Sequence, residues 1–307
     1  MTDPAVPEAA RLAVLGSPIG HSRSPRIHRA AYEVLGLPWE YGAVECDEAR
    51  LSGWLGERGS EWRGLSLTMP LKEEAHRLAA VLDPVAQESG VVNTLLRLLG
   101  GTWAGFNTDV GGLAAAIREA GLDATRTIVL GAGATAVSAA MAARDLGAEQ
   151  IRVCARRSAA SSALVARLLQ ARSDTGTPWP YLESWDLGAG SDGSGSVSLA
   201  AALELEQDPS SPESTLVIST LPGSAGRGLE VPAALAGIPL FDVAYDPWPS
   251  PLAERWRDAG GEAHSGLGML LHQALLQIRI FVGGDPALPL DGEAEVLAAM
   301  RHAVVRE

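Results

Sequence analysis

The chain has 307 residues, 47% of them hydrophobic and 20% charged, and a formal net charge of −13. This acidic balance argues against a nucleic-acid-binding protein, and no apolar run reaches the roughly 18 residues that a membrane helix needs. Two cysteines, Cys46 and Cys154, are too few for a disulfide framework or a cysteine-rich zinc site. The N-terminus lacks the basic and then apolar regions of a secretory leader, so we expect a cytoplasmic protein.

Apolar β-rich runs alternate with Ala- and Leu-rich helical runs, which is typical of an α/β protein with parallel sheets. In the first part of the chain we expect strands at 11–15, 39–45, 65–68, 91–98 and 102–106, and helices at 25–35, 51–57, 70–82 and 110–120. Further along we expect strands at 127–130, 151–155, 215–220 and 239–245, an Ala-rich helix ending at 146, and helices at 161–171, 267–282 and 294–305. Residues 173–214 are rich in Ser, Gly and Pro, which indicates an insertion with one strand near Tyr181 and its loosest part at 188–196.

The first serines of interest follow the strand at 11–15. Ser22 and Ser24 are two residues apart and precede Pro25, at the expected start of a helix. Their hydroxyls are suited to holding a carboxylate. On spacing alone, however, the simpler role for Ser24 is to cap the helix.

One lysine and two asparagines stand out because the chain contains no other residue of either type. Lys72 is the only lysine among the 24 basic residues, and Asn93 and Asn107 are the only asparagines. Lysine is among the commonest residues of ordinary proteins. The alternative to a special role is chance, but we expect each of the three to do something that Arg, Gln or Ser cannot.

Lys72 follows the strand at 65–68 and falls in the first turn of the next expected helix, just after Pro70. A lysine there suits proton transfer, which an arginine cannot perform because it stays charged. A solvated surface lysine is the alternative. Asn93 and Asn107 both precede a threonine on adjacent arms of a hairpin around 100–101, and Asp109 follows as either an active-site carboxylate or a helix cap.

The segment 127–136, TIVLGAGATA, is a strand that leads into G-x-G-x-x-A and then a helix, which favours a dinucleotide site over an ordinary glycine turn. Gly131 permits the tight turn, Gly133 lets the backbone approach a pyrophosphate, and Ala136 allows close helix–strand packing. After the second strand an NAD site usually has an acid, whereas this chain has Arg156 and Arg157. Two guanidiniums favour the 2′-phosphate of NADP; the alternative is a solvated loop.

Taken together, these segments resemble the shikimate dehydrogenase family. The matching blocks, in order, are G-S-P-I-G-H-S-R-S-P-x-x-H at 16–28, S-L-T-M-P-L-K at 66–72, V-N-T at 92–94, G-F-N-T-D at 105–109, G-A-G-A-T-A at 131–136, D-V-A-Y at 242–245 and G-L-G-M-L-L-H-Q at 266–273. Two departures are Ser66, where the family often has Asn, and Ala155 before the two arginines.

The resemblance implies two α/β domains: a substrate-binding domain of residues 1–108 and 266–307, and a Rossmann-like NADP-binding domain of residues 109–265, with the active site in the cleft between them. It implies the reversible NADPH-dependent reduction of 3-dehydroshikimate to shikimate, in the pathway to chorismate and the aromatic amino acids. The expected partners are the small-molecule substrate and NADP, without metal, nucleic acid or membrane. The chain is expected to be a monomer or a homodimer.

Residue roles follow from the resemblance by position. Lys72 and Asp109 are implied as the catalytic pair, which also contacts substrate. The other implied substrate-binding residues are Ser22 and Ser24 for the carboxylate, assisted by Tyr245, and Thr68, Asn93 and Gln273 for the ring hydroxyls. The implied cofactor-binding residues are Gly131, Ala132, Gly133, Ala134, Thr135, Ala136, Arg156, Arg157, Thr220 and Gly266.

Three alternatives remain at this stage. A quinate/shikimate dehydrogenase that prefers NAD is disfavoured by Ser24, where a bulkier Thr is expected for quinate, and by the missing acid after the second cofactor strand. A noncatalytic paralogue that binds shikimate or dinucleotide predicts binding without turnover. An unrelated Rossmann enzyme, such as a methylene-tetrahydrofolate dehydrogenase, explains the fold but not the S-x-S and N-T-D blocks.

Overall fold

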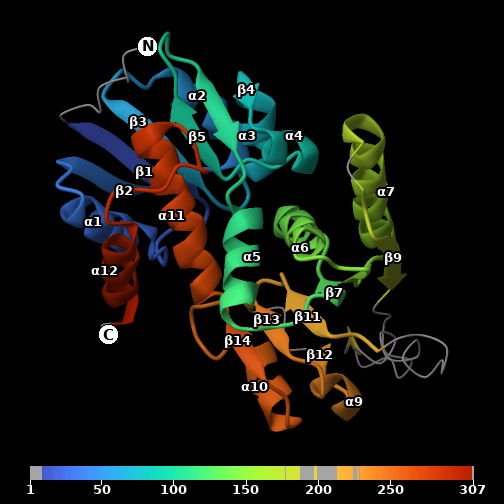
Figure 1. Cartoon of the computed structure of the whole chain (residues 1–307). Coiled ribbons are helices and arrows are strands. Elements are labelled where there is room, and N and C mark those ends of the chain that lie inside the picture. Colours follow the sequence, from blue (N-terminus) through green and yellow to red (C-terminus); the bar gives the residue numbers. More distant parts are fainter. Residues whose placement is uncertain are drawn as a thin grey trace. The chain divides into compact units, whose positions relative to one another are not determined.

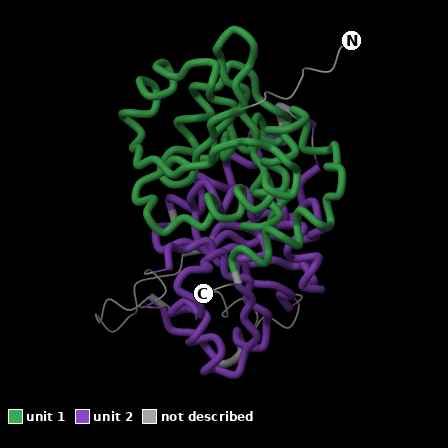
Figure 2. Tube along the Cα trace, turned by 90° about the vertical axis from the view of Figure 1, so that its left-hand side faces the viewer, with its two compact units in different colours: residues 1–112, 270–307 green, residues 113–269 purple. Residues whose placement is uncertain are grey.

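A computed structural model describes residues 9–176, 178–186, 197–198, 213–223, 227 and 229–305, and Figure 1 traces the chain through its helices and strands. It separates into two compact units, Met1–Gly112 with Leu270–Glu307, and Leu113–Met269 (Figure 2). Both boundaries fall inside helices, α5 (Asp109–Glu119) and α11 (Leu267–Gly283). Among the described residues, no helix combines the length and apolar character that crossing a bilayer requires.

The first unit is built on a six-stranded sheet in the order β2-β1-β3-β5-β6-β4. Its strands are β1 (Ala10–Gly16), β2 (Trp39–Glu45), β3 (Trp62–Leu67), β4 (Val81–Leu82), β5 (Thr94–Arg97) and β6 (Trp103–Phe106). Strands β1, β2 and β3 are parallel, whereas β5 is antiparallel to both β3 and β6. The ends of β1, β3 and β6 and the start of β5 therefore lie at one edge of the sheet.

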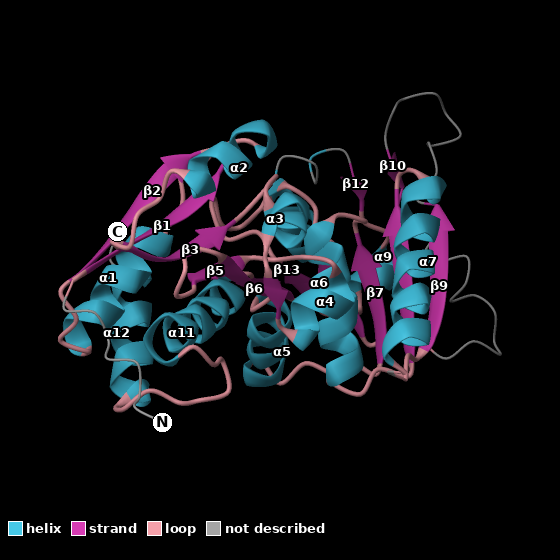
Figure 3. Ribbon diagram, turned by 90° about the horizontal axis from the view of Figure 1, so that it is seen from above, coloured by secondary structure: helices cyan, strands magenta, loops and turns pink. Residues whose placement is uncertain are grey.

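Helices flank this sheet, and α12 packs against α1 (Figures 1 and 3). Besides α5 and α11, the helices of this unit are α1 (Ser24–Val34), α2 (Glu48–Gly56), α3 (Lys72–Leu78), α4 (Pro84–Ser89) and α12 (Glu293–Val305). The apolar faces of α2 and α3 meet the sheet in a buried cluster that includes Leu51, Leu65 and Leu71. That cluster fixes the strand ends from which the polar loops leave.

The second unit is built on a six-stranded sheet in the order β14-β13-β11-β7-β8-β9, in which every pairing is parallel. Its strands are β7 (Arg126–Leu130), β8 (Gln150–Ala155), β9 (Tyr181–Asp186), β11 (Leu216–Ser219), β13 (Leu240–Asp242) and β14 (Ala263–Ser265); a separate short pair joins β10 (Val197–Ser198) to β12 (Leu229–Glu230). The chain leaves β7 outward through β8 to β9 and then returns to the other side of β7. This is the 3-2-1-4-5-6 strand order of a Rossmann fold, whose ligands bind where the order reverses.

The helices of the second unit are α6 (Ala134–Asp145), α7 (Ser158–Thr175), α9 (Ala233–Ala236) and α10 (Pro251–Asp258). The strands at the sheet centre, β7 and β11, are mostly apolar and are buried except for Arg126 at the start of β7, as expected for a parallel sheet covered on both faces. Alanines make up most of the buried part of α6, from Ala136 to Ala143, and they let this helix lie close to the sheet. Helix α7 packs along β8 and β9, and Figure 3 shows it beside β9.

The structure confirms the predicted α/β class and most of the predicted elements, with several corrections. The helix expected at 70–82 ends at Leu78, because the backbone turns extended at Ala79 and the next residues pair with β6 as β4. The strand expected at 91–98 spans only Thr94–Arg97, and the one expected at 239–245 spans only Leu240–Asp242. The elements that were not predicted are helices α4, α9 and α10 and strands β4, β10, β12 and β14. The predicted strand near Tyr181 is β9, whereas the segment 188–196 lies outside the described residues.

His28 is fully buried in the core of the first unit. Its ring stacks on Tyr41 with centroids 4.0 Å apart, and Tyr32 and Phe281 complete the surroundings. Its Nδ1 donates to the carbonyl oxygen of Ser24 at 2.9 Å. Burial raises the pKa of both tyrosines, so both are uncharged at physiological pH. Burial lowers the pKa of His28 from 6.5 to about 4.

Protonation of His28 is expected to destabilise the fold in acid. The unfolded chain, in which His28 titrates near 6.5, binds more protons than the folded chain between that pH and about 4. The free energy of unfolding therefore falls as the pH drops through this window, by about 3 kcal/mol in total. Urea unfolding measured across the window should show a clearly shallower slope for His28→Phe, with His302→Gln on the exposed face of α12 as control. Identical slopes for the wild type and His28→Phe would contradict this.

Candidate active site

Four loops of the first unit leave the sheet at the edge described above. One follows β1 and carries Ser22, one follows β3 and carries Thr68 and Lys72, one precedes β5 and carries Asn93, and one follows β6 and carries Asp109. Backbone hydrogen bonds hold the loops together, from Thr68 N to Leu15 O at 2.9 Å and from Asn93 N to Phe106 O at 3.0 Å. The sheet register thus gathers residues that lie far apart in the sequence.

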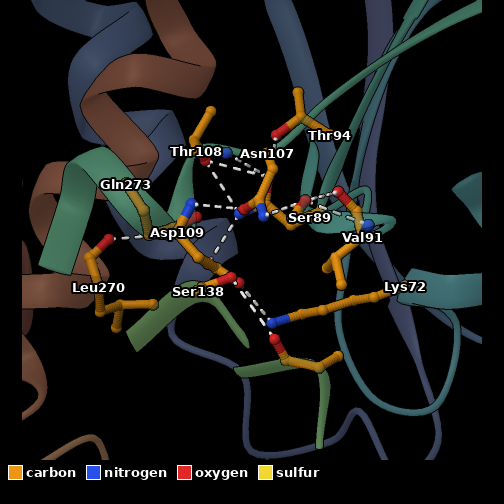
Figure 4. Close-up of polar contacts among 12 residues, drawn as sticks. Lys72, Ser89, Val91, Thr94, Asn107, Thr108, Asp109, Ser138, Leu270 and Gln273 are labelled. Atoms are coloured by element: carbon orange, nitrogen blue, oxygen red, sulfur yellow. Dashed lines mark hydrogen bonds and ion pairs between the residues drawn. The ribbon is translucent and has the colours of Figure 1, made fainter. Parts of the chain in front are cut away.

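Lys72 and Asp109 form an ion pair at this edge. The Lys72 ammonium donates to Asp109 Oδ2 at 2.6 Å, and the two side chains are only 12% and 6% exposed. Figure 4 shows the lysine side chain reaching across to the carboxylate. Lys72 is the first residue of α3, in agreement with its predicted place in the first turn. Because little water surrounds the pair, the attraction between its charges is weakly screened.

Asp109 does not cap α5 from outside the helix, as one interpretation of the sequence had it. It is the first helical residue, and both of its carboxylate oxygens accept hydrogen bonds from distant side chains. Oδ2 accepts from Lys72, and Oδ1 accepts from Asn93 Nδ2 at 2.7 Å. The carboxylate is thereby fixed in one orientation between a lysine and an asparagine.

Asn93 is buried, and its amide is fully engaged within the protein. Its Nδ2 donates to Asp109 and to Thr108 Oγ1, while its Oδ1 accepts from the backbone N–H of Thr108 at 2.9 Å and from Thr94 Oγ1 at 2.8 Å. A direct contact between this amide and a ring hydroxyl therefore requires one of these bonds to be given up. The structure gives Asn93 a second role, that of orienting Asp109.

Asn107 holds the other side of the same loop. Its Oδ1 accepts from the backbone N–H of Asp109 at 3.1 Å, and its Nδ2 donates to Ser89 Oγ at 3.0 Å (Figure 4). The backbone N–H of Asn107 donates to Asp83, which also caps α4 through Ala86 N. Ser89 and Asp83 were missed from the sequence because α4 was not predicted. Both asparagines of the chain thus serve the loop that carries Asp109.

The predicted carboxylate-binding serines lie at the start of α1. Ser24 is the first residue of that helix and is buried, so it is not the cap that spacing favoured; the capping position is Arg23, without a side-chain hydrogen bond. Ser22 Oγ accepts from the backbone N–H of Ser24 at 3.3 Å. Thr68, half-buried, stands beside β1, where a Cβ on Gly16 would come within 2.4 Å of its methyl group.

Gln273 lies on α11, where this helix crosses α5. It is 8% exposed, and its Nε2 donates to Leu270 O at 2.8 Å (Figure 4). The crossing is close, since a Cβ on Gly112 would lie 2.6 Å from Gln273 Cβ and 2.7 Å from its backbone nitrogen. Gly112, which the sequence did not single out, therefore sets the position of Gln273 one turn beyond Asp109.

Tyr245, also predicted to bind substrate, belongs to the second unit. It is half-buried in the loop after β13. The buried carboxylate of Asp242 shapes this loop by accepting from Ser250 Oγ at 2.5 Å and from Ala244 N at 3.3 Å. Burial raises the pKa of Asp242, with these hydrogen bonds opposing the shift. Strand β13 ends at Asp242, and the turn that this carboxylate stabilises places Tyr245 in the loop beyond the sheet.

The predicted dinucleotide loops lie at the carboxyl ends of the strands of the second unit. Gly131 has a φ of +117°, and a Cβ on it would lie 2.3 Å from Thr220 Oγ1, so only glycine fits between β7 and β11. This is the point where the strand order reverses. No side chain caps the start of α6 at Gly133, which suits the binding of a phosphate at the helix N-terminus. The segment from Ala132 to Ala136 makes up the turn and the first residues of α6.

Arg156 and Arg157 directly follow β8, and both are exposed. Thr220 follows β11, and its Oγ1 donates to Leu130 O at 2.9 Å. Gly266 follows β14 and is buried, because it packs on the backbone of Val243 and its N–H donates to Ala244 O at 3.1 Å. A glycine-lined turn, an uncapped helix start and two exposed guanidiniums together fit a phosphorylated dinucleotide.

Comparisons with known proteins agree with this geometry. A family model described as the shikimate dehydrogenase substrate binding domain matches residues 14–95. A shikimate dehydrogenase (NADP(+)) of Anaeromyxobacter sp. (strain Fw109-5) is 35% identical over 88% of this chain and 90% of its own length. The chain belongs to the shikimate dehydrogenase family.

Solved structures of the shikimate dehydrogenase family have the same fold. Shikimate dehydrogenase from Mycobacterium tuberculosis is 36% identical, with a TM-score of 0.76 over 95% of this chain and 99% of its own. Shikimate 5-dehydrogenase from Thermus thermophilus, in complex with NADP(H) and shikimate, is 29% identical, with a TM-score of 0.75 over 96% of this chain and 100% of its own.

Replacing Gly112 by alanine is expected to destabilise the protein. The new methyl group collides with the backbone of α11 and forces the two helices apart, which should lower the free energy of unfolding by about 1–3 kcal/mol in urea titrations. Gly53→Ala in α2 is the matched control, because its Cβ meets nothing within 4 Å and alanine favours a helix by about 1 kcal/mol over glycine. An equal stability of the two variants would mean that α5 and α11 are not in close contact.

Proposed function

We propose that this chain catalyses the reversible NADPH-dependent reduction of 3-dehydroshikimate to shikimate, a step toward chorismate and the aromatic amino acids. The observation that carries the proposal is the buried pair of Lys72, the only lysine of the chain, with Asp109, in a chain that belongs to the shikimate dehydrogenase family. Membership alone does not require an intact pair, whereas catalysis does. The reaction is proposed for the cytoplasm, by a monomer or a homodimer.

The chemistry needs a proton at the ring oxygen. NADPH, when bound, supplies the hydride that reduces the carbonyl. As the carbonyl is reduced, its oxygen gains negative charge, and the Lys72 ammonium is suited both to stabilise that charge and to give it a proton. Asp109 holds the amine in place, so the two groups act as a coupled pair. In the reverse direction, the neutral amine of Lys72 takes the proton from the hydroxyl of shikimate.

Substrate is assigned to the loops of the first unit. Ser22 and Ser24 are proposed to bind the carboxylate, assisted by Tyr245 of the second unit. Thr68, Asn93 and Gln273 are proposed to bind the ring hydroxyls, with Asn93 acting in part through Asp109. Because the chain carries a net charge of −13, the exposed positive charges of Arg156 and Arg157 are needed to attract an anionic ligand, whereas the charge of Lys72 is balanced by Asp109.

NADP is assigned to the second unit. Gly131 and the uncapped start of α6 are proposed to receive the pyrophosphate, with Thr220 beside Gly131. Gly266, in the loop after β14, is proposed to contact the cofactor as well. Arg156 and Arg157 are proposed to bind the 2′-phosphate, since no acid follows β8 to accept a ribose hydroxyl. The same absence argues against an NAD-preferring quinate/shikimate dehydrogenase.

Turnover should depend on shikimate, NADP⁺ and Lys72. Nicotinamide absorbance is followed with shikimate and with quinate, each with NADP⁺ and with NAD⁺. We expect rapid reduction only for shikimate with NADP⁺, and a loss of at least about 100-fold in kcat for Lys72→Ala, since general acid–base groups contribute roughly 10²–10⁴-fold. Binding of shikimate or NADP⁺ without turnover of any pair would instead identify a noncatalytic binding protein.

Cofactor choice should depend on Arg156 and Arg157. Hydrogen bonds to charged groups contribute about 1.5–3 kcal/mol each, so the double variant Arg156→Gln/Arg157→Gln should lose roughly 100-fold or more in kcat/KM for NADP⁺ and little for NAD⁺. Arg118→Gln, an exposed arginine on α5, controls for the loss of positive charge. An unchanged preference for NADP⁺ in the double variant would show that the two arginines belong to a solvated loop.

A further inference from the structure

A continuous chain of buried hydrogen bonds runs through the first unit and ends on Asp109. The Tyr41 hydroxyl donates to Ser66 Oγ at 2.6 Å, and Ser66 Oγ donates to Gln277 Oε1 at 2.7 Å. Gln277 Nε2 donates to Thr94 Oγ1 at 3.0 Å, and Thr94 Oγ1 donates to Asn93 Oδ1 at 2.8 Å. Asn93 Nδ2 then donates to Asp109 Oδ1. The five donor residues are at most 4% exposed.

Two backbone groups determine which atom donates and which accepts in each hydrogen bond of this series. The backbone N–H of Thr108 can only donate, so the atom of Asn93 that faces it is the oxygen, and the amide nitrogen must face Asp109. The backbone oxygen of Asn93 can only accept, at 3.3 Å from Gln277 Nε2, so the nitrogen of Gln277 faces β5 and its oxygen faces Ser66. Ser66 therefore donates its single hydroxyl hydrogen to Gln277, and Tyr41 must donate to Ser66.

The chain of bonds is more than a way of filling the core with polar groups. Its members come from β2, β3, β5, α11 and the loop before β5, and each bond is directed toward the carboxylate that holds Lys72. Tyr32, in the same aromatic cluster, shows the contrast, because its buried hydroxyl has no hydrogen-bond partner among the described residues. Hydrogen bonds aligned head to tail also polarise one another, which strengthens the last bond, from Asn93 to Asp109.

We propose that Gln277 and Ser66 are positioning residues for the Lys72–Asp109 pair, acting through Thr94 and Asn93. Gln277 is the central link of this hydrogen-bond series. Among its members, only Gln277 joins α11 to both β3 and β5. Without it, Thr94 loses a donor and Asn93 loses the contact to its backbone oxygen. The direct bonds of the Asn93 amide to Thr108 and Asp109 remain, but Asn93 and Thr94 are held less firmly, so the amide orients Asp109 less precisely. The proposal rests on the proposed function only in taking Lys72 and Asp109 as the catalytic pair.

The test uses Gln277→Met, which keeps the volume of the side chain but removes its hydrogen bonds, and Ser66→Ala. Tyr41→Phe and Tyr32→Phe form a matched pair, since each removes one buried hydroxyl from the same cluster and only Tyr41 belongs to the chain of bonds. For Gln277→Met we expect kcat with shikimate to fall about tenfold or more, because small displacements of catalytic groups are costly, while KM for NADP⁺ stays unchanged. Ser66→Ala and Tyr41→Phe should give smaller losses in kcat, and Tyr32→Phe none.

The single lysine provides a readout that does not require turnover. Protein labelled with ¹⁵N-lysine contains one labelled residue besides any cleavable tag, so its spectrum reports one backbone amide and one side-chain ammonium, both of Lys72. The ammonium signal is observable when the ion pair protects its protons from exchange with water. The amide signal of the same residue reports whether α3 remains folded.

The proposal predicts that Gln277→Met weakens or abolishes the ammonium signal while the amide signal persists, and that Tyr32→Phe leaves both signals unchanged. It is overturned if Gln277→Met keeps either the wild-type ammonium signal or the wild-type kcat. A purely structural role for Gln277 gives that result, with only a lower midpoint of urea unfolding. If the wild type does not turn over shikimate, the proposed function fails, but the ammonium signal still decides whether Gln277 positions Lys72.

Discussion

The carboxylate of Asp109 is the group on which the arrangement of the first unit depends. It lies where the chain leaves β6 and begins α5, and it accepts from Lys72 on one oxygen and from Asn93 on the other. A buried carboxylate is costly unless its oxygens are hydrogen-bonded. The surrounding loops meet that requirement with both asparagines of the chain. Asn107 binds the backbone N–H of Asp109 and is itself held by Ser89. Asn93 binds the carboxylate and is supported, through Thr94, by Gln277 and Ser66.

The two units use the same physical device, a sheet that brings distant loops to one edge. In the first unit, mixed pairing places the start of β5 beside the ends of β3 and β6. In the second, the reversal of strand order places Gly131 beside Thr220. At Gly112 and at Gly131 there is no room for a Cβ, and this close packing sets the positions of Gln273 and Thr220.

The sequence predicted the strands and helices with regular apolar patterns, and it predicted Lys72 in a first helical turn, because those features are local. It did not predict α4 or the end of α3 at Leu78, which depends on the pairing of β4 with β6. Spacing also favoured a cap at Ser24 and left a cap open as one role of Asp109, whereas each is the first residue of its helix. The contributions of Ser66, Gln277 and Gly112 arise from contacts between residues up to 211 positions apart, and no local pattern in the sequence marks them.

The central claim is that Lys72 and Asp109 act as one unit in the chemical step. A double-mutant cycle on kcat/KM for shikimate tests it directly, with Lys72→Met, Asp109→Asn and the combined variant, at saturating NADP⁺. If the two groups form one catalytic device, the combined variant loses no more than the worse single variant, because removing either partner already disables the pair. If the two losses multiply, Lys72 and Asp109 contribute independently, and the pair is not the single catalytic device that its geometry indicates.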